Sequence, residues 1–409
     1  MLKEGKKTAI VLGGTFPHIE LIHKLKDRGY YTILVDYYKN PIAKFSADKH
    51  IRESTLNKDK VLEIAGENRA NIVISACIDQ ANATACYVAE KLKLPMPYSY
   101  ETAINVTNKY LMKKIMFKNN IPTAKFYCIK NINDFDPNTL SFPIIIKPSD
   151  SNSSKGVRKI NTNDKNINNY LMDAFSISRT GEVIVEEFKE GKEAGIDCII
   201  KDSKAKIIMT RERRKIISNN NIQQIYGSFW PANFPNKIFE ELKKIAQNIA
   251  DSFCLNNTPL MVQAIINDNN INIIEFAPRI GGGENYRIIK MLTNYDIIDA
   301  AIDSFLGHPI KLNYNKSNAY ISDNYIYAKP GVFGSFSINN NVKNSIEYFN
   351  VYKTKGTEIG TEISSNNRVG VFTVKSNTIE GLKEKINLII KNIEVYDING
   401  NPIMIKDIY

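Results

Sequence analysis

Runs of apolar residues separated by polar turns predict that the chain opens with alternating strands and helices. Residues 8–12, TAIVL, form a short apolar run typical of a buried strand. A helical pattern follows from about Pro17 to Arg28, and further apolar runs cover Tyr31 to Asp36 and Asn71 to Ala76. Because strands that alternate with helices usually form parallel sheets, this pattern indicates a βαβ opening.

Polar residues that follow these predicted strands are candidates for ligand contact. Gly13 and Gly14 join the first strand to the helix, but GGTFPH lacks the spacing of a dinucleotide-binding motif, so close helix–strand packing is the favoured interpretation. Asp36 and Asp79 follow two other strands, at the edge where parallel sheets commonly bind ligands. Helix capping explains these two carboxylates nearly as well.

The rest of the chain predicts a mixture of helices and strands. Helices are expected over residues 105–119, 239–253, 288–305 and 379–391. Strands are expected over residues 142–147, 182–188 and 207–215, and short strands with Gly and Asn turns follow from about residue 311. The helix expected over residues 105–119 carries Lys109, Lys113, Lys114 and Lys118, and most of these lysines are interpreted as solvated surface. Arg368 is the cation to watch in the last region, although an ordinary surface arginine is the favoured interpretation.

The segment Met261–Arg287 predicts a β-hairpin that leads into a glycine-rich loop. Apolar and β-branched residues flank a polar turn. If the loop comprises Asp268 to Asn270, Gln263 and Glu275 become cross-strand neighbours with side chains about 5 Å apart. A two-residue loop would place these side chains on opposite faces of the sheet. The register of the hairpin therefore decides whether they can share a metal ion.

Two polar segments indicate binding of phosphate or another anion. Lys147 ends an apolar strand, and the small polar loop Ser149–Gly156 follows it. Backbone amides and hydroxyls in such a loop can surround a polyphosphate, although composition alone favours a surface turn. The second segment, IIMTRERRK, places four cations between residues 211 and 215. Because neighbouring cations repel one another, an anionic ligand is a reasonable partner for them, with a solvated strand edge as the alternative.

Composition limits the classes of protein to which the chain can belong. A length of 409 residues with 43% hydrophobic types fits two or three globular domains. The formal net charge is +11, but the lysines are spread along the chain, which disfavours nucleic acid and favours small anions. Five cysteines without CxxC spacing argue against disulfides or a zinc site. Without a long apolar segment, we expect no membrane partner and a cytoplasmic protein.

Five motifs in a fixed order give the chain a resemblance to a known superfamily. They are NKYLMK, IIIKPSDSNSSKGV, VEEFKEGKE, VQAII and IIEFAPRIGGG. In this order they resemble the ATP-grasp superfamily. The chain looks most like its carboxylate–amine ligase branch, which includes L-amino-acid ligases, purine-biosynthesis carboxylases and carbamoyl-phosphate-synthetase-like enzymes.

The resemblance implies a fold and a domain organisation. The expected fold is a mixture of α/β and α+β, built as an ATP-grasp fold. A Rossmann-like domain would cover residues 1–105, and an ATP-grasp domain would cover 106–310, with a flap lobe at about 121–188. A small C-terminal accessory lobe would cover 311–409.

The resemblance also implies roles for individual residues. ATP would contact Lys109, Lys147, Ser149, Ser153, Ser154, Gly156, Glu186, Glu187, Phe188 and Glu193. Within this set, residues 186–188 would hold adenine through backbone groups, and Glu193 would bind the ribose. Mg²⁺, or Mn²⁺ in its place, would be held by Gln263 and Glu275. The catalytic cations would be Arg279, Lys215 and Arg213. The substrate would contact Gly282, Gly283, Glu284, Asn285 and Arg287.

The reaction implied by the resemblance is ATP-dependent formation of a C–N bond. A small carboxylate would be activated as an acyl phosphate and joined to a small amine, with release of ADP and phosphate. A homodimer is compatible with the resemblance. Two alternatives are activation of formate or bicarbonate, as in purine biosynthesis, and nucleotide binding without catalysis. Gln263 and Ala277 stand where many relatives have glutamate and asparagine, so a second metal ion is less well supported than the first.

Overall fold

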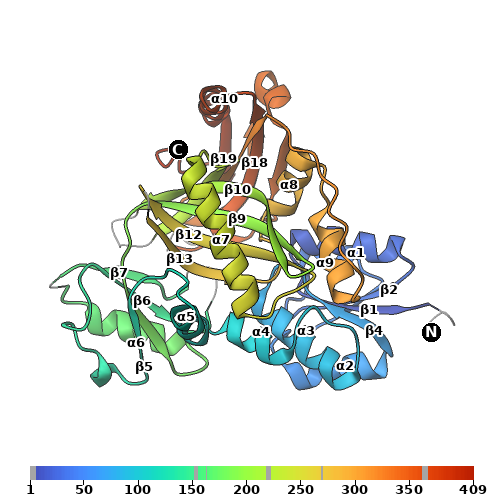
Figure 1. The fold of residues 1–409 in the computed structure, drawn as a ribbon. Helices are drawn as coiled ribbons and strands as arrows, with labels where there is room; N and C mark the ends of the chain where they lie inside the picture. The colour runs from blue at the N-terminus through green and yellow to red at the C-terminus, as the bar shows by residue number, and fades with distance from the viewer. Residues whose placement is uncertain (1–5, 152–154, 163, 218–222, 269, 362–366) are drawn as a thin grey trace.

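The strands of the chain form four sheets in the part that the structure describes (Figure 1). This computed structural model describes residues 6–151, 155–162, 164–217, 223–268, 270–361 and 367–409. One sheet is parallel and the others are antiparallel. The mixture of α/β and α+β predicted from the sequence is therefore confirmed.

The parallel sheet forms the N-terminal domain. Its strand order is β3-β2-β1-β4, with β1 at Thr8–Leu12, β2 at Tyr31–Val35, β3 at Lys49–Ile51 and β4 at Ala70–Ile74. The helices of this domain are α1 at Phe16–Asp27, α2 at Lys58–Glu67 and α3 at Asp79–Leu92. Gly13 has a φ of +99°, and a Cβ there would collide with Ile78. This glycine therefore permits a close approach between segments, in agreement with the packing interpretation.

A small sheet forms the flap lobe. Its order is β5-β8-β6-β7, with β5 at Phe126–Ile129, β6 at Ile144–Pro148, β7 at Arg158–Ile160 and β8 at Val183–Glu187. Helix α6, Ile167–Ile177, packs on this sheet through buried Leu171 and Ala174. The lobe thus has a hydrophobic core of its own.

The largest sheet has eight strands in the order β13-β12-β9-β10-β11-β14-β18-β16. Its first five are β9 at Lys192–Lys201, β10 at Lys204–Ile217, β11 at Gln223–Trp230, β12 at Thr258–Asn267 and β13 at Asn270–Ala277. The other three are β14 at Tyr320–Tyr327, β16 at Tyr348–Val351 and β18 at Arg368–Ser376. The sheet is continuous across the domain boundary predicted near residue 311, and that boundary stays a prediction.

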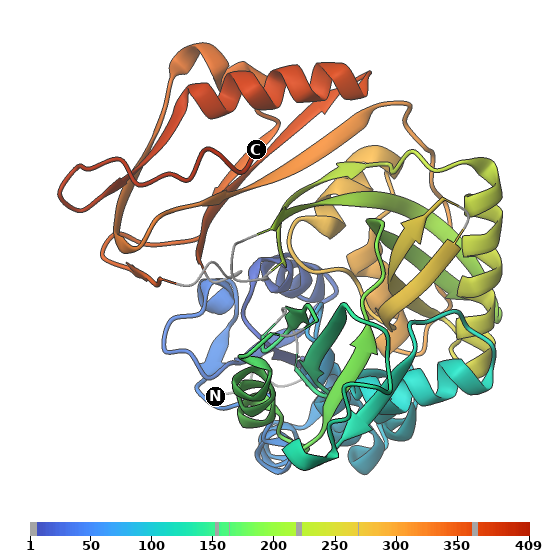
Figure 2. The same ribbon diagram turned by 90° about the vertical axis from the view of Figure 1, so that its left-hand side faces the viewer.

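A three-stranded sheet completes the C-terminal region. It has the order β17-β15-β19, with β15 at Gly331–Ile338, β17 at Glu358–Ile359 and β19 at Ile393–Asp397. Helix α10 covers Ile379–Lys391, as predicted. Figure 2 shows this orange and red region above the blue N-terminal domain. In the described part of the chain, no helix is long and apolar enough to cross a membrane.

Two predicted long helices are each divided into two. The expectation of one helix over 105–119 is wrong, because α4 ends at Thr107 and α5 covers Lys109–Lys118. Asn108 lies between them and accepts hydrogen bonds from the backbone N–H groups of Tyr110 and Leu111, which caps α5. In the same way the helix expected over 288–305 is two helices, α8 at Asn285–Thr293 and α9 at Ile297–Phe305. The remaining helices are α4 at Tyr100–Thr107 and α7 at Asn236–Ser252.

Ion pairs fasten the N-terminal domain to the core of the molecule. Lys24 of α1 lies 2.9 Å from both Asp296 and Asp299. Arg28 contacts Asp303 at 2.6 Å. Because these contacts join α1 to α9 directly, they hold the parallel sheet in place beside the residues that follow the hairpin.

Candidate functional site

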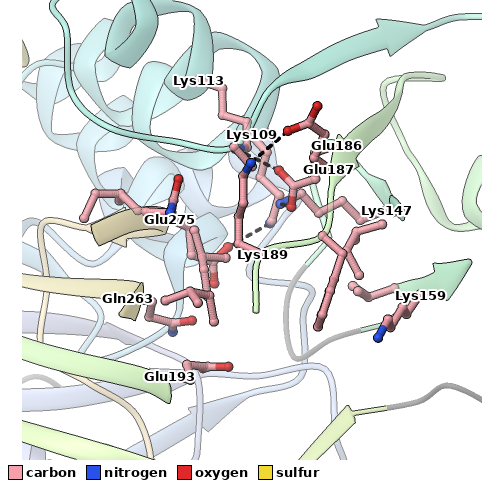
Figure 3. A pocket seen from close by; sticks show the side chains of 18 of the residues that line it. Lys109, Lys113, Lys147, Lys159, Glu186, Glu187, Lys189, Glu193, Gln263 and Glu275 are labelled. Atoms are coloured by element: carbon pink, nitrogen blue, oxygen red, sulfur yellow. Dashed lines mark hydrogen bonds and ion pairs between the residues drawn. The ribbon is translucent and has the colours of Figure 1, made fainter. Parts of the chain in front are cut away.

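A cleft between the flap lobe and the large sheet brings many of the predicted residues together (Figure 3). From the flap lobe come Lys147, Glu186 and neighbouring residues, and from α5 come Lys109 and Lys113. The facing wall is formed by Glu193, Arg213, Lys215, Gln263 and Glu275 of the large sheet. We refer to this cleft as the nucleotide pocket, in line with its predicted ligand.

The hairpin of β12 and β13 places Gln263 directly opposite Glu275. The strands end and begin at Asn267 and Asn270, so the connection has two residues, which is the shorter of the two alternatives that the sequence left open. The register shifts between Gln263 and Ala264, and this shift restores the pairing that a two-residue connection alone would remove. Both side chains therefore line the same pocket.

These two side chains fit a single hard cation. Mg²⁺ prefers oxygen ligands and keeps several water molecules, so one carboxylate and one amide oxygen are a sufficient protein contribution. No group of three or more His, Cys, Asp or Glu side chains with metal-binding geometry occurs in the described ranges. The number of bound metal ions stays a prediction.

Lys109 lies beside this hairpin. Its Nζ is 3.4 Å from Oε2 of Glu275 and donates a hydrogen bond to the carbonyl of Ser151 at 2.5 Å. The side chain thus joins α5 to the candidate metal ligand and to the polar loop that follows Lys147. A phosphate at the edge of this loop would meet the Lys109 ammonium group.

Glu186 is buried between two lysines. Its Oε1 lies 2.5 Å from Nζ of Lys147, and its Oε2 lies 2.8 Å from Nζ of Lys113. Burial by itself would raise the pKa of Glu186, but the two ammonium groups lower it to about 2. Lys113 is an exception to the interpretation of most lysines of this helix as solvated surface, since its side chain is 1% exposed.

The predicted adenine segment has few backbone donors left. The N–H group of Glu187 donates to the carbonyl of Lys125, and that of Phe188 donates to the carbonyl of Pro143. The side chain of Glu187 pairs with Lys189 at 2.8 Å. The Phe188 ring lies in the pocket wall with the ammonium group of Lys159 3.9 Å from its centre. Phe188 therefore offers a ring surface to a ligand.

The serine-rich loop is only partly positioned toward the pocket. Ser149 is fully buried and shares a 2.7 Å hydrogen bond with Thr180, so its side chain does not line the pocket. Gly156 has a φ of +71° and packs against Pro148 and Ile177. Ser153 and Ser154 lie outside the described residues. Among the described residues of this segment, Ser151, Lys155 and Val157 line the pocket.

The cations of β10 have partners within the protein. Arg213 lies 2.8 Å and Lys215 lies 2.5 Å from the two carboxylate oxygens of Glu193. Arg211 pairs with buried Asp197 at 2.6 Å. Alternation along the strand sends Arg214 to the opposite face, where it donates to Ser322. Repulsion among these cations is therefore offset by partners within the protein, and an anionic ligand for them stays a prediction.

Arg279 is held by a residue of the N-terminal domain. Its Nε and Nη2 lie 2.7 and 3.0 Å from the two carboxylate oxygens of Asp79, and its Nη1 donates to the carbonyl of Ile280 at 2.8 Å. Asp79, which the sequence singled out at a strand end, therefore positions the arginine. Although burial lowers the Arg279 pKa, the Asp79 carboxylate raises it overall, so the guanidinium stays charged.

A second, larger cavity adjoins the nucleotide pocket. It has a volume of about 900 Å³, and Gln263, Glu275 and Arg213 line both spaces. Arg279 lines the larger one. Its other walls come from the N-terminal domain, the glycine-rich loop after β13 and the C-terminal strands. We refer to it as the substrate cavity.

The predicted substrate residues have different positions relative to this cavity. Gly282, Gly283, Glu284 and Asn285 line it. The side-chain amide of Asn285 bonds with Asp197 at 2.7 Å, and Arg287 does not line the cavity but lies 3.4 Å from Glu284. Burial raises the pKa of Glu284, which also accepts a 3.1 Å hydrogen bond from Tyr352.

Arg368 lines the substrate cavity, so the interpretation as an ordinary surface arginine is wrong. Its guanidinium donates to the hydroxyl of Tyr327 at 2.9 Å and to the carbonyl of Ile225 at 2.8 Å. It also lies 4.0 Å from the centre of the Tyr325 ring. The C-terminal region therefore contributes a positive charge to the site.

Comparison with known proteins defines the class of this chain. Residues 140–286 match the ATP-grasp domain family. The chain therefore carries an ATP-grasp domain, as the ordered motifs predicted. The matched residues run from the flap lobe through the hairpin, which line the nucleotide pocket, to the glycine-rich loop, which lines the substrate cavity.

Particular relatives are ligases and synthases. The chain is 23% identical over 330 residues to the carbamoyl phosphate synthase large chain of Clostridium botulinum (strain Loch Maree / Type A3), which covers 78% of this chain and 30% of that protein. It is 24% identical over 265 residues to the L-arginine-specific L-amino acid ligase of Bacillus subtilis, with 62% of each covered. The aligned regions thus span less than two thirds of both relatives.

A solved structure agrees in fold over nearly the whole chain. The L-amino acid ligase from Bacillus licheniformis superposes with a TM-score of 0.80 at 16% identity, covering 97% of this chain and 100% of the other. The match shows that the two chains share a fold over nearly their whole length, with the ATP-grasp domain of this chain at residues 140–286.

Sequence reasoning missed Lys113 as a pocket residue and gave Arg368 no role in the site. For Lys113 the signal was available, because it follows Lys109 by one helical turn and so shares its face. For Arg368 no local signal exists, since the partners of its guanidinium lie 41 and 143 residues away along the chain.

Proposed function

We propose that the protein is an ATP-dependent ligase that activates a small carboxylate as an acyl phosphate and joins it to an amine. The observation that carries the proposal is the shared wall between the two spaces. Gln263, Glu275 and Arg213 line both the nucleotide pocket and the substrate cavity. A γ-phosphate held at this wall would face a carboxylate that enters from the other side.

The proposed reaction has two steps. A carboxylate oxygen attacks the γ-phosphorus, and the bond to the β-phosphate oxygen breaks to release ADP. The amine nitrogen then attacks the acyl carbon, phosphate leaves, and the nitrogen loses a proton. Both steps gather negative charge at the shared wall, so catalysis depends on fixed positive groups there.

The residues of this chain have separate roles in the proposal. Lys109 and Lys147 hold the phosphates of ATP, and Gln263 with Glu275 holds Mg²⁺, which supplies charge neutralisation at the transferred phosphate when bound. Arg279 stabilises the acyl phosphate from the substrate cavity. Arg213, which lines the shared wall, and Lys215 are the further catalytic cations of the proposal, and both contact Glu193, the proposed ribose ligand.

The substrate cavity has room for a carboxylate and an amine that are both of amino-acid size. A space of about 900 Å³ lies within the range of drug-sized ligand sites, far beyond what a four-atom anion fills. Arg368 offers a cation and Glu284 a carboxylate to a substrate that has several polar groups. We therefore propose a carboxylate and an amine of amino-acid size, handled by a cytoplasmic enzyme.

Phosphate release tests the proposal. Purified protein with Mg·ATP is incubated with amino acids, singly and in pairs, and with formate or bicarbonate plus amines, and products are identified by mass. Release that depends on amino acids supports ligation, whereas release that depends on formate or bicarbonate contradicts it. Intact ATP with every substrate would favour nucleotide binding without catalysis. Arg279→Ala should abolish turnover and keep most of the ATP affinity, and full activity of this variant would overturn the assignment.

A further inference from the structure

Lys113 is a fully buried cation in the nucleotide pocket whose role no motif assigns. It lies in the middle of α5, its side chain is 1% exposed, and its Nζ contacts the carboxylate of Glu186 at 2.8 Å. The other oxygen of Glu186 contacts Lys147 at 2.5 Å. We propose that Lys113 is a positioning residue, which takes up part of the Glu186 charge and so leaves Lys147 free to bind nucleotide phosphate. This inference rests on the nucleotide site of the proposed function.

The net charge of these three side chains supports this role of Lys113. Lys147 and Glu186 alone form a neutral pair, and a neutral buried pair attracts a triphosphate weakly. With Lys113 the cluster holds two ammonium groups and one carboxylate, so a net charge of one remains. Figure 3 shows Lys147 and Glu186 in the pocket with Lys113 on the helix behind them. Both lysines line the pocket and are almost fully buried, with side chains 1% and 4% exposed, so the excess charge lies in the wall that a phosphate would meet.

Hydrogen bonds also support this role, because they connect Lys113 to the candidate metal site. Nζ of Lys113 donates to the hydroxyl of Thr123 at 2.5 Å, and this hydroxyl donates to the carbonyl of Ile273 at 2.9 Å. Ile273 also donates its N–H group to the carbonyl of Pro122 at 2.8 Å. Ile273 precedes Glu275 by two residues on β13. Lys113 therefore fixes the flap lobe, through Glu186, relative to the hairpin that faces it.

The ionisation of Lys113 makes this role measurable. Burial lowers the pKa of Lys113 to about 8, attraction by Glu186 opposes the shift, and repulsion by Lys147 adds to it. Glu275 of β13 attracts the same ammonium group more weakly, and the Phe126 ring of β5 lies 5.3 Å from it. The proton is therefore lost slightly above neutral pH, and the cluster then loses its net charge.

Nucleotide binding as a function of pH tests the inference. The probe is adenylyl imidodiphosphate with Mg²⁺, and its dissociation constant is measured by calorimetry from about pH 7 to about pH 9. The wild type should bind about ten-fold more weakly at the higher pH, because one net charge is lost at the phosphate site. Lys113→Arg should bind with little pH dependence, because arginine stays protonated. Lys113→Met should bind weakly at both pH values.

Lys114→Met is the matched control. Lys114 is the next residue of α5 and its side chain is exposed, so this variant should follow the wild-type pH profile and report any titration of the probe itself. The inference is overturned if the nucleotide affinity of Lys113→Arg falls with rising pH as much as that of the wild type. It is also overturned if Lys113→Met binds the nucleotide with wild-type affinity. If Lys113→Met does not fold, the arginine variant decides alone. The measurement needs no ligase substrate, so failure of ligation in the product assay is a separate result.

Discussion

Asp79 and Arg279 form a two-contact ion pair between residues that are 200 positions apart in the chain. Asp79 is the first residue of α3 in the N-terminal domain, and Arg279 follows β13 at the border of the substrate cavity. The position of the guanidinium therefore depends on how the N-terminal domain sits against the large sheet. A domain that looks remote from phosphate chemistry thus orients the main proposed catalytic cation.

Asp79→Asn should lower turnover about ten- to hundred-fold while ATP affinity stays nearly unchanged. The amide keeps the shape of the carboxylate but loses the charge-assisted contacts that hold Arg279, and such contacts contribute roughly 1.5–3 kcal/mol each. Steady-state phosphate release and nucleotide calorimetry check the two parts. Asp59 is an exposed acid in the same domain, so Asp59→Asn is the control and should leave both turnover and ATP affinity unchanged. Equal loss in kcat and in ATP affinity would point to a general folding defect instead.

Gln263→Glu should increase the affinity for divalent metal. The new carboxylate would lie opposite Glu275 in the paired strands, so two charged oxygen donors replace one. We expect half-maximal nucleotide binding at about ten-fold lower Mg²⁺ concentration. Asn267→Asp adds the same charge at the exposed end of β12 and is the matched control. If Gln263→Glu requires the same Mg²⁺ concentration as the wild type, the hairpin does not bind the metal ion.

Arg368→Gln should raise the KM for a substrate that carries a negative group, by about ten-fold, and should leave nucleotide affinity unchanged. The reason is that Arg368 brings a guanidinium to the cavity wall, where it donates hydrogen bonds to a tyrosine hydroxyl and a backbone carbonyl. Substrate titrations in the phosphate assay measure the effect. Lys329→Gln, at an exposed position of the same region, should have no effect. A change in ATP affinity alone would argue that Arg368 serves the nucleotide.

The Glu186 carboxylate should make the protein sensitive to acid. Its pKa is about 2 in the folded protein against an ordinary value of 4.5, so the unfolded chain binds more protons between these values. The associated stability, on the order of 3 kcal/mol, is present above about pH 4.5 and is lost as the pH falls toward 2. Urea unfolding followed by the fluorescence of buried Trp230, the only tryptophan, measures it.

Glu186→Gln should lack this acid-dependent part of the free energy of unfolding. The variant should also be less stable at neutral pH, because Lys113 and Lys147 then lie together in the interior without the carboxylate between them. Glu240→Gln, at an exposed position of α7, should keep the wild-type profile. Parallel pH profiles for Glu186→Gln and the wild type would show that other carboxylates dominate the acid response.

Much of the secondary structure could be predicted, because local patterns determine it. The apolar run at β1, the amphipathic helix at Ile379–Lys391 and the order of the five motifs are properties of short segments. The two divided helices show the limit of this reasoning. Apolar periodicity continues through Asn108 and Asn294, whereas the breaks depend on a side-chain cap and on a left-handed residue with φ of +53°.

The sequence by itself determined the strands, the motifs and the residue types that an ATP-grasp site requires. The tertiary structure decided which of those residues meet. A register shift in the hairpin pairs Gln263 with Glu275, although the short connection alone predicts opposite faces. Asp79 reaches Arg279, and Arg368 reaches the cavity, only through contacts between distant segments. The physical reason is that charge partners and burial depend on neighbours in space, which the local pattern of a chain does not contain.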